Sequence, residues 1–199
     1  MTDKATSNYV HILALGRGMA DRLALERPSN MTDWPQLENE WRQVELRLRT
    51  RHGYDVLRGM LDTDVALLLH NVRRRLHYWA TALRFHDYAA LLGDSYQAVQ
   101  QAALEVATTD QTVLIDKGTH YGDSWKKRGG VGAFMMLARK WDRLENILGG
   151  VGSGPELVAA LRRNPGNVQD DAHDLRRYLL LVEDEAANQR LDGGARAAS

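Results

Sequence analysis

Cysteine is absent from this chain of 199 residues, which excludes disulfides, a thiolate nucleophile and zinc sites with thiolate ligands. Long apolar runs are missing too, because residues 65–69 and 133–138 are wholly apolar but far too short to span a membrane. The polar first eight residues lack the basic and then apolar pattern of a signal peptide. We therefore expect a cytoplasmic protein with no membrane association.

An excess of charge of one sign is also lacking, since 26 Lys and Arg balance 26 Asp and Glu. Broad binding to a nucleic acid backbone depends on a positive field, so this balance argues against a nucleic acid partner and leaves only a local basic patch open. Lysine itself is scarce, and four of the five lysines fall within residues 117–140. That window is where we look for chemistry.

Signals for β-structure are missing as well, whereas apolar residues recur at helical spacing along the chain. The pattern predicts an all-α protein, a helical bundle of about six to seven helices. The expected helices cover residues 9–26, 33–52, 63–92, 95–118, 131–148, 155–163 and 168–191, with a possible break at 108–110. Residues 120–130 are expected to be a loop, and residues 149–154 a glycine-rich linker.

The segment 126–132 places three cations before glycines that precede a helix. The start of a helix presents unpaired N–H groups and a partial positive charge, and glycine lets an anion approach the backbone closely. This is a plausible phosphate site, although no Gly-Lys-Ser/Thr follows to make it a P-loop. The alternative is a solvated loop.

Two acidic pairs at helical spacing are candidate magnesium ligands. Asp142 and Glu145 are three residues apart on one helix, and Asp171 and Asp174 are three apart on the last helix, beside its apolar stripe. Together they could supply four carboxylates to one Mg²⁺. The alternatives are local surface ion pairs for the first pair and a favourable helix N-terminus for the second. This arrangement resembles that of the all-α nucleoside triphosphate pyrophosphatases of the MazG and dimeric dUTPase type, which bind Mg²⁺ through acidic pairs on successive helices.

Three motifs in order carry a closer resemblance. They are a Tyr-Gly-x-Ser-Trp loop at 121–125, an Arg-Lys-x-x-Arg-Leu helix at 139–144 and an acidic Asp-x-x-Asp-Leu-x-x-Tyr helix at 171–178. The combination resembles the nucleotide modification associated domain family of its first type, over roughly residues 110–185. That family is common in phages and bacteria and is associated with nucleotide or DNA-base modification.

The resemblance implies a role for each matching residue. Asp171 and Asp174 would be catalytic, holding a metal or orienting water. Lys117, Tyr121, Ser124 and Trp125 would form a substrate loop in which the two aromatic rings stack on a base, and Lys140 and Arg143 would contact phosphate. The basic segment at 126–132 adds Lys126 and Arg128 to the residues expected to bind phosphate. The structural alternative for Trp125 is core packing.

The function expected from these motifs is Mg²⁺-dependent hydrolysis or transfer at a nucleotide phosphoanhydride. The alternative is a non-catalytic nucleotide-binding or protein-interaction module, which keeps the basic residues and needs no metal. The division expected is a helical region of unknown role at 1–105, a MazG-like nucleotide-handling domain at 106–191 and a disordered tail at 192–199. The partners expected are a nucleotide or nucleoside phosphate and, through long amphipathic helices, a second copy in a homodimer.

Overall fold

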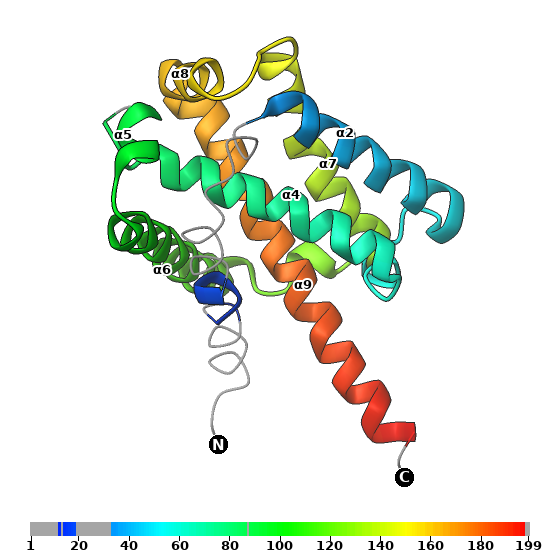
Figure 1. The fold of residues 1–199 in the computed structure, drawn as a ribbon. Helices are drawn as coiled ribbons and strands as arrows, with labels where there is room; N and C mark the ends of the chain where they lie inside the picture. Colours follow the sequence, from blue (N-terminus) through cyan, green and yellow to red (C-terminus); the bar gives the residue numbers. More distant parts are fainter. Residues whose placement is uncertain (1–11, 13, 19–32, 87, 198–199) are drawn as a thin grey trace.

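The computed structural model describes residues 12, 14–18, 33–86 and 88–197. This part of the chain is helical and contains no strand, only an isolated bridge between Asp33 and Ser153. The predicted all-α fold class is therefore confirmed (Figure 1). No helix in the described ranges has the length and apolar character needed to cross a membrane.

The helices follow one another through short connections. Their bounds are α2 Trp34–Arg47, η2 Leu48–His52, α3 Val56–Gly59, α4 Thr63–Ala82, α5 Tyr88–Gly93, α6 Tyr96–Tyr121, η3 Ser124–Lys126, α7 Gly129–Leu148, α8 Pro155–Arg163, η4 Pro165–Gln169 and α9 Asp170–Ala197. Of these, η2 and η4 are π-helical turns and η3 is a 3₁₀ turn.

Short polar side chains begin several of the helices. Asp33, Asp55, Asp62 and Ser95 stand at the N-caps of α2, α3, α4 and α6, and each side chain accepts a backbone N–H of the first turn. Such caps satisfy donors that would otherwise lack a partner. The sequence predicted the starts near Asp33, Asp62 and Ser95, and those three are confirmed.

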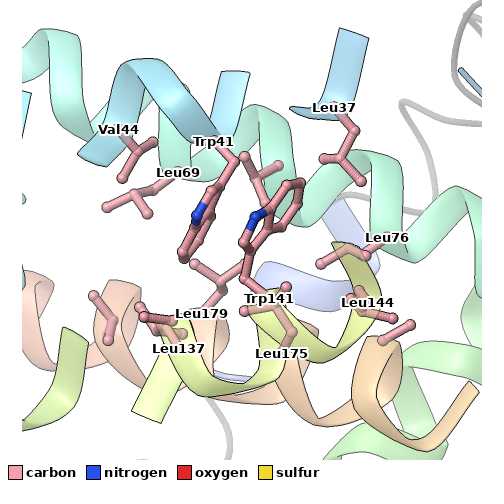
Figure 2. Close-up of a cluster of buried hydrophobic side chains, with 14 of the residues drawn as sticks. Leu37, Trp41, Val44, Leu69, Leu76, Leu137, Trp141, Leu144, Leu175 and Leu179 are labelled. Atoms are coloured by element: carbon pink, nitrogen blue, oxygen red, sulfur yellow. The ribbon is translucent and has the colours of Figure 1, made fainter. Parts of the chain in front are cut away.

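The centre of the bundle lies where α2, α4, α7 and α9 meet, and Figure 1 shows α4 crossing α9 there. Trp41 of α2 stacks on Trp141 of α7 with ring centroids 4.9 Å apart, and Trp34 stacks on the same Trp141 ring at 5.2 Å. Leucines of α4, α7 and α9 surround the rings of Trp41 and Trp141 in Figure 2. The leucines of α7 and α9 pack together in this core, so the two helices lie side by side.

Several helix boundaries differ from the sequence prediction. The loop expected over 120–130 is mostly helical, since α6 reaches Tyr121, η3 spans Ser124–Lys126 and α7 begins at Gly129. The helix expected over 63–92 ends at Ala82 and resumes as α5, because Phe85 turns into a second apolar cluster with Leu91 and Val158. The helix α6 runs unbroken through 108–110 and reaches Tyr121, since its threonine hydroxyls bond back to carbonyls four residues earlier and leave the helix intact. The last helix continues as far as Ala197, so the tail expected to be disordered from residue 192 is helical up to that point.

The main core draws on both of the regions that the sequence divided at residue 105. Its members run from Trp34 to Ala186, and the boundary itself falls inside α6. The helix expected over 9–26 lies largely outside the described residues, within which positions 12 and 14–18 are helical.

Candidate functional site

A single lysine joins the two aspartates of α9. Lys140 Nζ on α7 donates to Asp171 Oδ1 at 3.0 Å and to Asp174 Oδ2 at 2.8 Å. The three side chains meet because α7 and α9 pack side by side and because Asp171 and Asp174, one turn apart, face the same neighbour. The structure thus brings together three residues that the sequence singled out.

Three further cations surround this centre. Arg143 Nε lies 3.0 Å from Asp171 Oδ2, Lys117 Nζ lies 2.9 Å from Asp174 Oδ1, and Arg177 contacts the same oxygen at 3.5 Å. The Lys117 and Arg143 side chains are 45% and 47% exposed, whereas that of Asp171 is 3% exposed. Asp171 is therefore buried, Asp174 is partly buried with its side chain 19% exposed, and two of the cations face solvent.

The pKa values in the cluster follow from these contacts. Burial alone would lower the pKa of Lys140, but its hydrogen bonds to Asp174 and Asp171 outweigh burial and raise the pKa. Burial alone would raise the pKa of Asp174, but Lys140 and Lys117 outweigh it and lower the pKa. Lys140 is therefore an ammonium ion and Asp174 a carboxylate at neutral pH.

A buried ion pair supports the cluster from beneath. Asp110 of α6 accepts from Arg176 Nε at 2.6 Å and Nη2 at 2.7 Å, with both side chains almost fully buried. The same carboxylate accepts from Arg177 Nε at 2.9 Å, and Arg177 in turn contacts Asp174. Sequence reasoning did not single out Asp110 as a functional residue. Its signal was an acid four residues after Val106 and four before Leu114, within an apolar stripe.

We name these eight residues the ion network: Asp110, Lys117, Lys140, Arg143, Asp171, Asp174, Arg176 and Arg177. Its cations outnumber its carboxylates, so the network carries a surplus of positive charge. Positive charge held in fixed positions at the edge of a protein attracts anions, and arginine in particular suits phosphate.

The other acidic pair faces elsewhere. Glu145 lies 4.0 Å from Arg42 of α2, and Asp142 is exposed. Burial raises the pKa of Glu45 on α2, and the nearby charges of Asp142 and Glu145 raise it further, which places both beside α2. The four carboxylates expected to share one Mg²⁺ therefore lie apart: Asp142 and Glu145 are on the side of α7 that faces α2, whereas Asp171 and Asp174 of α9 contact Lys140 on the side of α7 that faces α9.

The donor set around Asp171 and Asp174 does not fit magnesium. A divalent cation needs several oxygen ligands, but here the ammonium group of Lys140 lies between the two carboxylates and would repel it. No group of three His, Asp or Glu side chains with the geometry of a metal site occurs in the described part of the chain. The magnesium site stays a prediction from the sequence.

The candidate substrate-binding residues between 121 and 128 form no ion pair with the ion network in the described part of the chain, and the ion pairs of Lys126 are with other residues. Lys126 pairs with Glu185 and Asp123, and these carboxylates raise its pKa against the opposite effect of burial. Trp125 is half-buried against the main core, with Lys126 Nζ 5.8 Å from its ring centroid. The exposed side chains nearby are Tyr121, Ser124 and Arg128. Core packing, the alternative for Trp125, thus describes its surroundings.

The glycines at the start of α7 have a packing role. A Cβ added to Gly130 would lie 1.7 Å from Asp55 Oδ1, so α7 begins directly against the N-cap of α3. Gly129 has a φ of +68°, a conformation that favours glycine. A carboxylate of the chain itself already lies beside this helix start, where the sequence suggested a phosphate.

Comparison with known proteins adds no relative: no family model, curated protein or solved structure matches this chain. The function is therefore argued from the site alone.

Proposed function

We propose that this protein binds the phosphate group of a nucleotide at the exposed edge of the ion network. The observation that carries the proposal is the convergence of Lys117, Lys140 and Arg143 from two helices onto two carboxylates that they outnumber. Two of the three cations are about half exposed, so each can contact a ligand while it keeps its carboxylate.

The carboxylates act here as positioning groups. Asp171 and Asp174 hold the flexible heads of Lys140 and Arg143 in place before a ligand arrives. Ordering long side chains in advance lowers the entropic cost of binding. This arrangement favours the binding module over the metal-dependent hydrolase, because Lys140 supplies the positive charge that a metal would otherwise supply.

The first test is the melting temperature of the purified chain with nucleoside mono-, di- and triphosphates, each with Mg²⁺ and with EDTA. A ligand that binds only the folded state raises the melting temperature by mass action. We expect a shift that EDTA leaves unchanged. A shift that requires Mg²⁺ would contradict this proposal and support the hydrolase expected from the sequence, and no shift with any nucleotide would refute both.

Substitutions locate the site. Arg143→Met should weaken binding roughly 10- to 100-fold, since it removes a charge-assisted hydrogen bond to phosphate. Arg139→Met is the matched control, because Arg139 is exposed on the same helix and makes no ion pair with any residue of the described ranges. If the two variants bind equally well, the phosphate lies elsewhere.

A further inference from the structure

A pocket of about 360 Å³ lies directly beside the ion network. Its walls are Arg143, Asn146, Ile147, Asn167 and Asp171. Arg143 and Asp171 also belong to the ion network, so the pocket and the proposed phosphate site share a wall. Its size is within the range of pockets that hold small ligands.

The pocket has a charged end and an amide end. On α7, Asn146 and Ile147 follow Arg143 by three and four residues, so all three share one face of the helix. On the other wall, Asn167 of η4 precedes Asp171 of α9 by four residues. Each wall therefore carries one residue of the ion network and, about one turn away, one asparagine.

The chemistry of the amide end differs from that of the ion network. Each asparagine offers both a donor and an acceptor, which is the pairing that recognises the edge of a heterocyclic base. Neither amide side chain is engaged in a hydrogen bond with another residue of the described part of the chain, so both are available to a ligand. Ile147 is 41% exposed and adds an apolar surface for the face of a ring.

We propose that this pocket receives the base of the bound nucleotide, with Asn146 and Asn167 contacting its hydrogen-bonding edge. The proposal rests on the proposed function, because Arg143 would hold the phosphate of the same molecule. It assigns the ligand as a nucleoside phosphate rather than a sugar phosphate or free phosphate, and it identifies the two asparagines as the residues that determine base preference.

The test is calorimetric titration of the full chain with two kinds of probe. Nucleoside monophosphates of the four common bases carry the base, and ribose 5-phosphate carries only the sugar and phosphate. We expect at least one nucleotide to bind about tenfold more tightly than ribose 5-phosphate, which corresponds to about one or two hydrogen bonds.

The variants Asn146→Ala and Asn167→Ala should each lose most of that preference while their affinity for ribose 5-phosphate stays at the wild-type value. Gln189→Ala, an exposed amide toward the other end of α9, should change neither. Equal affinity of the wild type for ribose 5-phosphate and for all four nucleotides would overturn the base pocket and leave phosphate binding intact. Failure of both kinds of probe to bind the wild type would overturn the proposed function itself.

Discussion

The buried pair of Asp110 and Arg176 provides the sharpest test of the structure. Asp110→Asn keeps the size of the side chain but removes its charge. It also turns an amide donor toward guanidinium groups that can only donate. Arg176 would then be a buried charge without its carboxylate. Breaking a buried ion pair by removing one partner costs about 3–5 kcal/mol, because the remaining charge stays desolvated.

For a chain of this size, that loss corresponds to a fall of roughly 6–20 °C in melting temperature. The measurement is urea unfolding followed by far-UV circular dichroism, with Asp116→Asn as the control, since Asp116 is exposed on the same helix. The control should stay within about 0.5 kcal/mol of the wild type.

Asp110→Asn should also change how the free energy of unfolding depends on pH. Burial raises the pKa of Asp110, but Arg176 and Arg177 outweigh it and hold the pKa below its ordinary value. A carboxyl with a lowered folded-state pKa stabilises the protein above its unfolded pKa of about 3.9 and loses that contribution as pH falls through the folded-state value. The wild type and Asp110→Asn should therefore converge in stability as the solution is acidified. If Asp110→Asn lowers the free energy of unfolding by less than about 1 kcal/mol at neutral pH, the pair of Asp110 and Arg176 is not buried as described.

Two other predictions concern packing and a buried histidine. Gly130→Ala should lower the free energy of unfolding by about 1–3 kcal/mol, because the added Cβ would meet the side chain of Asp55. Gly93→Ala is the control, since a Cβ at Gly93 would enter open space. Equal stabilities of the two variants in urea titration would contradict the close approach at Gly130. Burial, helped by the charge of Arg176, lowers the pKa of His77 to about 3, so the folded protein keeps this histidine neutral. The free energy of unfolding of the wild type should fall by up to about 1.4 kcal/mol per pH unit as pH drops below about 6.5, the pKa of histidine in the unfolded chain. His77→Gln should reduce this slope. An unchanged slope would show that His77 is not held neutral in the folded protein.

Much of the fold could be predicted from local patterns. The starts of α2, α4 and α6 follow from Asp33, Asp62 and Ser95, and α8 occupies the range 155–163 expected after the glycine-rich linker. The break after Ala82 could not be predicted in this way, since no glycine or proline marks it and the cause is packing of Phe85 with distant residues. Continuity of α6 through 108–110 has a tertiary contribution beside the local hydrogen bonds of its threonines, because Asp110 pairs there with arginines more than sixty residues away.

The site shows the same division between local and long-range information. Helical spacing predicts that Asp171 and Asp174 share one face of the last helix and that Lys140 and Arg143 share one face of the helix at 131–148. It cannot give the rotation and axial offset of α7 against α9, which here accompany the packing of Leu137 and Leu144 with Leu175 and Leu179 in the main core. One offset would place Asp142 and Glu145 opposite the aspartates and make a metal site. The observed offset places Lys140 there instead.

That offset also connects the two proposals. With Lys140 between the aspartates, the cluster has its own cation, and the remaining positive charge of Arg143 and Lys117 is directed to solvent. Because Arg143 lies between the carboxylates and the asparagine pocket, it is the residue through which a phosphate and its base would be held together. Arg143→Met should therefore reduce affinity for ribose 5-phosphate and nucleotide by similar factors, whereas the asparagine variants should affect the nucleotide alone. A phosphate site unrelated to the pocket would not produce this contrast.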